Sequence, residues 1–307
     1  MERVAIFLAA VAPGLLVLAY GVAKTRSRWS NEALHTAFLV GAVGALGAGA
    51  LEFGLEKLIS LDAAAPLVRA GVTAVLFAAI PEEAIKFLIL LGAAERHVDA
   101  RRLQDIVVLA LGVSLGFATL ENLLYVVFAS DWQSIAIGRS ILAVPGHGIF
   151  GLSMGALLTS ARLRTHRQRP VIVAALAVPM VLHAAYDFPL FALQGGYQPW
   201  IVAIWLAVLL LSAVLAIYLC NRVLPRAAEA DRISGRDTTP PATARHLIVG
   251  GCVLLIAAPL LGVLLFRLVG VQLVSAGALI SIFPAALGID LIWTGFRRRK
   301  LASATLS

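Results

Sequence analysis

Nearly the whole chain is divided into apolar stretches of the length that spans a lipid bilayer. Hydrophobic residues make up 60% of its 307 positions and charged residues only 14%, whereas a soluble domain carries about 25% charged residues. A membrane-spanning helix needs about 20 mostly apolar residues. Stretches of this kind cover residues 3–23, 33–56, 67–92, 104–129, 135–160, 171–192, 198–221, 247–268 and 272–295. The chain is therefore predicted to be all-α, a polytopic membrane helix bundle with about nine transmembrane helices.

Basic residues predict the orientation of this bundle. They cluster after the first, third, fifth, seventh and ninth stretches, as in the loop that holds Arg162, Arg164, Arg167 and Arg169. Because basic loops remain on the cytoplasmic side, we expect the N-terminus outside and the C-terminus in the cytoplasm. A cleaved signal peptide at residues 1–23 is the alternative, but its positive charge follows the apolar segment instead of preceding it.

The pattern divides the chain into five parts. We expect two N-terminal helices at 1–66, a four-helix core at 67–192 and a seventh helix at 193–224. A polar cytoplasmic linker at 225–246 is predicted from its proline, glycine, serine and threonine residues, and a C-terminal pair of helices with a basic tail at 247–307. Nucleic-acid binding is not expected, because the basic residues lie in short loops beside the membrane, where anionic headgroups account for them.

Charged residues interrupt the third apolar stretch, in the sequence Pro81-Glu82-Glu83-Ala84-Ile85-Lys86. Charges at membrane depth are costly and survive mainly where they face a polar cavity or perform chemistry. Glu82 and Lys86 are one helical turn apart, and Glu83 is within i+3 reach of Lys86. One carboxylate can thus be paired while its neighbour stays available as a general base. A structural ion pair between helices is the alternative interpretation.

The next three helices carry further polar groups. Glu121 lies in the fourth stretch, His147 near the middle of the fifth, and His183 and Asp187 are at i, i+4 in the sixth. This last spacing lets both side chains meet one centre, or lets the carboxylate orient the imidazole. Histidines and carboxylates on successive helices can form a metal site, with zinc the favoured ion. In a metal-free site the histidines would donate hydrogen bonds or carry protons.

Four motifs resemble those of the PrsW family of intramembrane proteases, within a wider superfamily that includes CAAX prenyl proteases and the APH-1 scaffold subunit. They are Glu82-Glu83-x-x-Lys86, Phe117-x-x-x-Glu121-Asn122 with Tyr125, the separate His147, and His183-x-x-x-Asp187. The resemblance covers about residues 70–190. CAAX proteases typically carry His in place of Glu121 and Asn in place of Asp187, so the chain is more similar to PrsW.

The resemblance implies an intramembrane endopeptidase that cuts in or near the transmembrane segment of a membrane protein, an anti-sigma factor in bacterial relatives. It implies that Glu82 and Glu83 activate water and that Asp187 orients His183. Glu121, His147 and His183 would be metal ligands or would stabilise the transition state. A zinc enzyme and a metal-free glutamic protease use the same residue types, so both remain open. The expected partners are a single-pass substrate and the lipids of a bacterial plasma membrane.

Two other functions compete with proteolysis. A noncatalytic scaffold of the same superfamily could keep the histidines but would not need both Glu82 and Glu83. An ion-coupled transporter could use the buried carboxylates as a relay, but transporters usually show paired half-repeats with interrupted helices, and the sequence shows no convincing pair. The adjacent glutamates therefore favour the protease.

Overall fold

The computed structural model describes residues 2–25, 31–97, 102–196 and 201–236, and the secondary structure within these ranges is entirely helical. The chain forms two compact units. Of the described residues, the first unit contains 2–25 and 118–145, and the second contains 31–97, 102–117, 146–196 and 201–236. The spans predicted at 247–268 and 272–295 lie outside the described residues.

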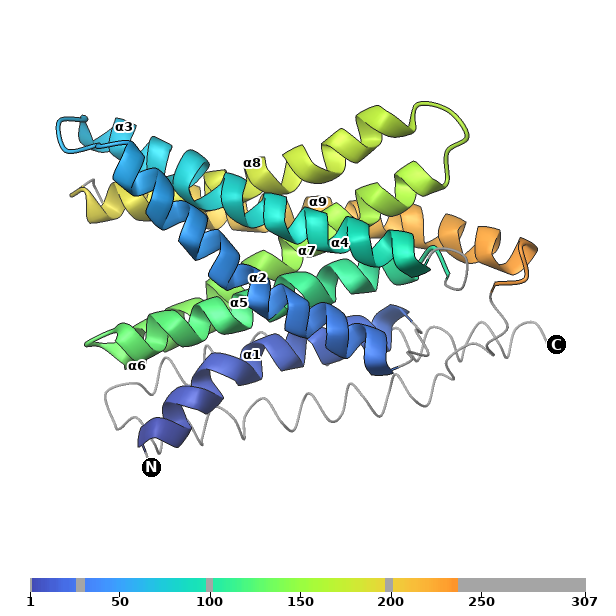
Figure 1. Ribbon diagram of the computed structural model, residues 1–307, viewed down its shortest axis with the longest axis horizontal. Helices are drawn as coiled ribbons and strands as arrows, with labels where there is room; N and C mark the ends of the chain where they lie inside the picture. Colours follow the sequence, from blue (N-terminus) through green and yellow to red (C-terminus); the bar gives the residue numbers. More distant parts are fainter. Residues whose placement is uncertain (1, 26–30, 98–101, 197–200, 237–307) are drawn as a thin grey trace. The chain divides into compact units, whose positions relative to one another are not determined.

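The helices follow the first seven predicted apolar stretches in order (Figure 1). They are α1 (Glu2–Thr25), α2 (Asn31–Leu58), α3 (Pro66–Val72), η1 (Thr73–Ala79), α4 (Ile80–His97), α5 (Asp105–Phe128), α6 (Trp132–Gly138), η2 (Arg139–Ala143), α7 (Val144–Arg162), α8 (Gln168–Gln194) and α9 (Ile201–Ile233). In α2, α5, α8 and α9 the segments Leu34–Leu58, Asp105–Phe128, Gln168–Gln194 and Ala203–Ile233 are long and apolar enough to cross a membrane. The all-helical fold is thus confirmed for the described residues, four of whose helices are suited to crossing a membrane, while the number of nine spans and the orientation stay predictions.

Two of the predicted spans contain a π-helical segment immediately before a proline. Segment η1 precedes Ile80-Pro81, and η2 precedes Val144-Pro145. The N–H of Ile80 donates to the carbonyl of Val75, and the N–H of Val144 donates to that of Arg139, so both bonds reach five residues back. Proline lacks an N–H and its ring clashes with the carbonyl four residues before it. A wider turn is one way in which a helix accommodates this.

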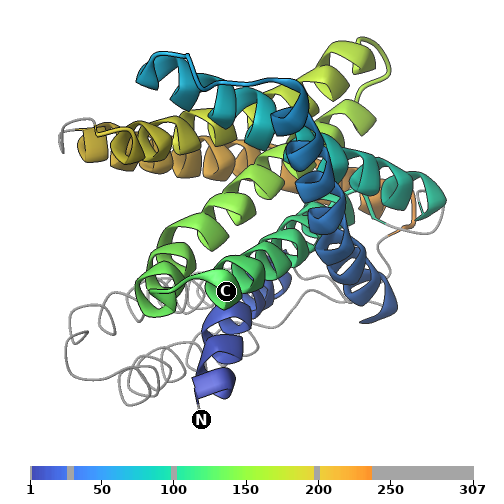
Figure 2. The ribbon, with the colours of Figure 1, turned by 60° about the vertical axis from the view of Figure 1, so that its left-hand side comes forward.

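In the second unit, α8 crosses the continuous helical run α3–η1–α4 and contacts all three of its parts (Figures 1 and 2). Helix α2 packs against α4 and also approaches α5 at two glycines. A Cβ atom added to Gly41 would overlap the backbone of Val113, and one added to Gly116 would overlap the backbone of Phe38. Small residues of this kind let helix backbones approach closely inside a membrane. These contacts assemble the helices that carry the polar residues of the core.

Helix α9 extends to Ile233, whereas the sequence pattern predicted a linker from residue 225. Pro225 lies inside the helix, and the side chain of Asp231 is fully buried. Its carboxylate accepts hydrogen bonds from the backbone N–H groups of Leu103 at 2.8 Å and Gln104 at 3.4 Å, in the turn that leads into α5. The last turns of α9 are therefore held by a contact with a distant segment, which local composition does not reveal. The rest of the predicted linker lies outside the described residues.

Replacing Asp231 with alanine should destabilise the second unit by about 1–3 kcal/mol, because two backbone donors would lose a buried acceptor. The expected result is a lower melting temperature of the purified protein in detergent. Glu229→Ala is the matched control, since Glu229 is exposed on the same helix and pairs only with Arg232 among the contacts described there. Equal melting temperatures for Asp231→Ala and the wild type would show that the buried contact does not hold α9.

Candidate active site

The first turn of α4 brings three charged side chains together inside the second unit. Lys86 Nζ lies 3.0 Å from Glu82 Oε2 and 2.8 Å from Glu83 Oε1. All three side chains are buried, and Glu83 and Lys86 are fully so. The sequence predicted that Lys86 could reach either carboxylate, and that one of them would stay available. In the structure the long Lys86 side chain bridges both, because residues three and four positions before it share its face of the helix.

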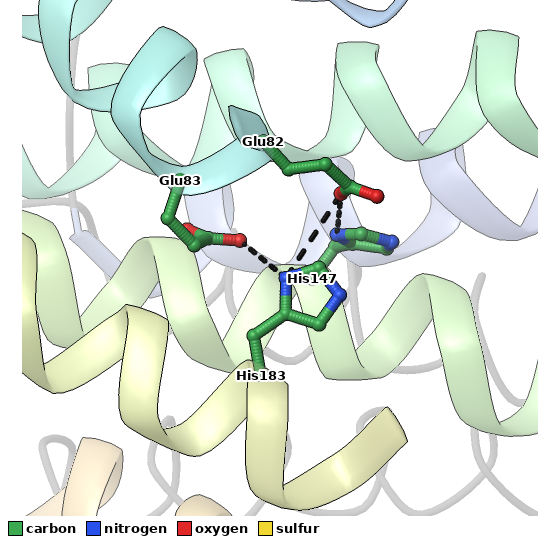
Figure 3. A group of neighbouring side chains, drawn as sticks. All are labelled: Glu82, Glu83, His147 and His183. Atoms are coloured by element: carbon green, nitrogen blue, oxygen red, sulfur yellow. Dashed lines mark hydrogen bonds and ion pairs between the residues drawn. The ribbon is translucent and has the colours of Figure 1, made fainter. Parts of the chain in front are cut away.

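Two histidines from other helices complete this cluster. His147 comes from α7 and His183 from α8, and both rings point toward the carboxylates of α4 (Figure 3). His183 Nδ1 lies 2.9 Å from Glu83 Oε1, whereas the Nδ1 atoms of His147 and His183 each lie 3.9 Å from Glu82 Oε2. Lys86 Nζ lies 2.9 Å from His147 Nδ1. Residues that are far apart in the sequence thus share one buried polar centre.

Asp187 holds the other side of the His183 ring. Its Oδ2 atom lies 3.1 Å from His183 Nε2, which is the contact that the i, i+4 spacing allows. Phe150 stacks on His183 with ring centroids 5.1 Å apart and planes tilted by 24°. Stacking on Phe150 therefore restricts tilting of the imidazole plane, and the carboxylates at its two nitrogens restrict rotation of the ring. Such fixation keeps Nδ1 directed at the polar centre.

The cluster fits a divalent metal ion. Glu82, Glu83, His147 and His183 are buried, and each offers one ligand atom within 4.8 Å of the others. Two imidazole nitrogens and carboxylate oxygens are a zinc donor set, and in a tetrahedral site with bonds of about 2.1 Å the ligand atoms lie roughly 3.4 Å apart. The contacts of 2.9 and 3.9 Å between these atoms bracket that value. Glu83 Oε2 is in addition buried without a hydrogen-bond partner among the described residues.

Glu121, the remaining residue predicted for the site, lies in the first unit. Its Oε1 atom forms an ion pair of 2.9 Å with Arg139 Nη2. Arg139 also donates to Asn122 Oδ1 at 3.2 Å and lies over the ring of Tyr125, with 4.0 Å between its Cζ atom and the ring centroid. The fully buried Asn122 donates in turn to the backbone carbonyl of Ala10 in α1. Glu121 thus belongs to a network around Arg139, and its role as a metal ligand stays a prediction.

The family of the chain follows from comparison with known proteins. The sequence model described as PrsW family intramembrane metalloprotease matches residues 30–217. The chain belongs to the PrsW family. The protein named Protease PrsW from Bacillus subtilis (strain 168) is 32% identical over 66% of this chain and 91% of its own length. Protease PrsW from Geobacillus kaustophilus (strain HTA426) is 31% identical over 66% of this chain and 88% of its own length. No solved structure matches the chain.

Membership in the PrsW family makes the chain an intramembrane protease, and hence a hydrolase. These two relatives are bacterial proteins, and four of the described helices are long and apolar enough to span a membrane. Together these observations indicate a multi-pass bacterial membrane protein. They also favour proteolysis over the scaffold and transporter functions that the sequence left open. The wider relation to CAAX proteases and APH-1 stays a prediction based on motifs.

Two residues that contact the predicted site residues were not predicted from the sequence: Arg139, which pairs with Glu121, and Phe150, which stacks on His183. Arg139 falls inside the predicted fifth span, and an arginine at membrane depth is itself a signal of a buried partner. Phe150 lies three residues after His147, about one turn along α7, so both side chains are on the same side of that helix. Its contact with His183 could not be inferred, because the two residues lie on different helices.

Proposed function

We propose that this PrsW protease hydrolyses a peptide bond in or near the transmembrane segment of a single-pass membrane protein, with zinc held by His147, His183 and Glu82. Glu82 replaces Glu121 in the ligand set predicted from the sequence, because Glu82 lies beside both histidines and Glu121 pairs with Arg139. Glu83 would activate the attacking water. The observation that carries the proposal is the buried cluster of four potential ligand atoms within 4.8 Å of one another. Burial of this donor set between helices is costly unless the groups are paired or bind an ion.

The distances support separate roles for the two glutamates. Glu82 Oε2 is equally distant, at 3.9 Å, from the facing nitrogens of His147 and His183, so these three atoms would form one face of the proposed ligand set. Glu83 keeps its Oε2 atom without a described partner, and this oxygen can take a proton from water. Zinc, when bound, would lower the pKa of that water and polarise the scissile carbonyl. Asp187 would hold His183 in the orientation that this ligand set requires.

The metal-free mechanism uses the same residues differently. Glu83 would again be the general base, and the imidazoles of His147 and His183 would donate hydrogen bonds to the developing oxyanion. The contact of 2.9 Å between His183 Nδ1 and Glu83 Oε1 places one of these imidazoles beside the base. Strong chelators distinguish the two mechanisms, since only the zinc enzyme should lose activity when the metal is removed.

We further propose nine spans in the plasma membrane, with the N-terminus outside. In that orientation His97, Arg162 and Gln168 mark the cytoplasmic ends of α4, α7 and α8. Glu82, His147 and His183 each lie 15 residues from these ends, which is about 22 Å by helical rise. In a hydrocarbon core of about 30 Å, all three residues lie at similar depth in the outer half. The proposed substrate is an anti-sigma factor, which would present one transmembrane helix to the site.

This depth predicts where the substrate is cut. Cleavage of a single-pass reporter in proteoliposomes should occur in the outer half of its transmembrane segment or at the outer end of that segment. Mass spectrometry of the fragment termini measures the position, and Glu83→Gln protein is the control for contaminating proteases. New termini on the cytoplasmic side of the segment would show that the proposed orientation or depth is wrong.

A further inference from the structure

The ammonium group of Lys86 lies in the middle of the proposed ligand set. Its Nζ atom is 3.0 Å from Glu82 Oε2, 2.8 Å from Glu83 Oε1 and 2.9 Å from His147 Nδ1. These atoms belong to three of the four residues that could hold a metal ion. Lys86 therefore places a positive charge among the same oxygen and nitrogen atoms that a divalent cation would use.

The ammonium and a metal ion cannot share these atoms. The Nδ1 atom of a neutral imidazole has one lone pair, so His147 Nδ1 either accepts a hydrogen bond from Lys86 or binds the ion. A zinc ligand lies only about 2.1 Å from the metal, which would bring the two cations close together in a buried site. Their repulsion there is screened far less than in water. Binding of the ion at this position therefore excludes the ammonium from it.

We propose that Lys86 and a divalent metal ion are alternative occupants of this position, so that Lys86 sets the metal affinity of the site. The proposal rests on the proposed zinc-dependent function, since it assumes that Glu82, His147 and His183 hold the ion. Loading with zinc requires Lys86 to release His147 and Glu82. The backbone of α4 need not move, because the lysine side chain has four rotatable bonds.

Phe117 also contacts the ammonium group of Lys86. Lys86 Nζ lies 4.1 Å from the centroid of the Phe117 ring, within the range of a cation–π contact. The ring is itself buried and packs near His147, with 5.9 Å between the ring centroids. Because the ring face uses none of the atoms that would bind the ion, this contact would remain for the ammonium when zinc takes His147 and Glu82.

The test compares the zinc affinity of the purified wild-type protein with that of Lys86→Met, measured by competition with a zinc-binding dye and without substrate. We expect Lys86→Met to bind zinc at least tenfold more tightly, because the competing cation is gone. Lys57→Met, at an exposed lysine of α2, should bind zinc as the wild type does. If Lys86 only supported the ligands, its removal would leave zinc binding unchanged or weaken it. Equal or weaker zinc binding by Lys86→Met would therefore overturn the proposal.

A second variant separates charge from packing. Lys86→Arg keeps the positive charge and should bind zinc no more tightly than the wild type; affinity equal to that of Lys86→Met would contradict the proposal. Lys86→Met leaves buried carboxylates without their cation, which should destabilise the zinc-free protein. Thermal unfolding with and without zinc therefore provides a second measurement. Zinc should raise the melting temperature of Lys86→Met more than that of the wild type, and an equal or smaller rise would also contradict the proposal.

Cleavage of the reporter by the same preparations separates this inference from the proposed function. Zinc binding with the expected order of affinities, but without cleavage, would support the role of Lys86 and refute proteolysis at this cluster. Cleavage by wild-type protein that binds no zinc would overturn the role of Lys86 while leaving a metal-free protease.

Discussion

Glu83→Gln should lower the rate constant of proteolysis by about 10²–10⁴-fold, which is the usual contribution of a general base. The substitution keeps the size of the side chain and the oxygen that faces His183, but removes the basic carboxylate. Because Glu83 is proposed to activate water and not to hold the ion, the zinc content of the variant should equal that of the wild type. Cleavage of a reporter in proteoliposomes and metal analysis of the same sample measure both quantities.

The control for this substitution is Glu229→Gln, at an exposed glutamate of α9, which should cleave the reporter at the wild-type rate. A wild-type rate for Glu83→Gln would refute its role as the base. Loss of inserted protein, instead of loss of activity, would support the interpretation of the cluster as a structural ion pair.

His183→Ala should lower zinc affinity at least tenfold and reduce proteolysis in parallel, because an imidazole is a preferred zinc ligand and His183 faces both glutamates. The wild type should contain about one equivalent of zinc. Dye competition gives the affinity, and the reporter assay gives the rate. His35→Ala, at an exposed histidine of α2, should change neither quantity. Full activity of metal-free protein in strong chelators would instead support the glutamic mechanism.

The helices and much of the cluster could be predicted because their signals are local. Apolar stretches of membrane length locate the helices, and the spacing of Glu82, Glu83 and Lys86 brings them to one face of α4. The same argument applies to His183 and Asp187, whose side chains meet at 3.1 Å in the structure. The π-helical segments before Pro81 and Pro145 were not predicted.

Contacts between helices could not be predicted in this way. The bond between Lys86 and His147 joins residues on α4 and α7, and nothing in the spacing of either helix shows that they face each other. Asp231 is similar, since its burial depends on a turn more than a hundred residues earlier in the chain. The pairing of Glu121 with Arg139 depends on how α5 and η2 pack within the first unit. The spacing of residues along a helix predicts which of them share a face, whereas the segment that packs against this face depends on the tertiary structure.

We propose that the polar cluster of α4, α7 and α8 cleaves membrane proteins. The most direct measurement is a proteomic comparison of membrane-protein fragments from cells that carry the wild-type chain and cells that carry Glu82→Gln, with equal amounts of inserted protein. We expect fragments with termini in or near a transmembrane segment that occur with the wild type and are absent with Glu82→Gln. Identical fragment sets in the two kinds of cell would contradict the proposal.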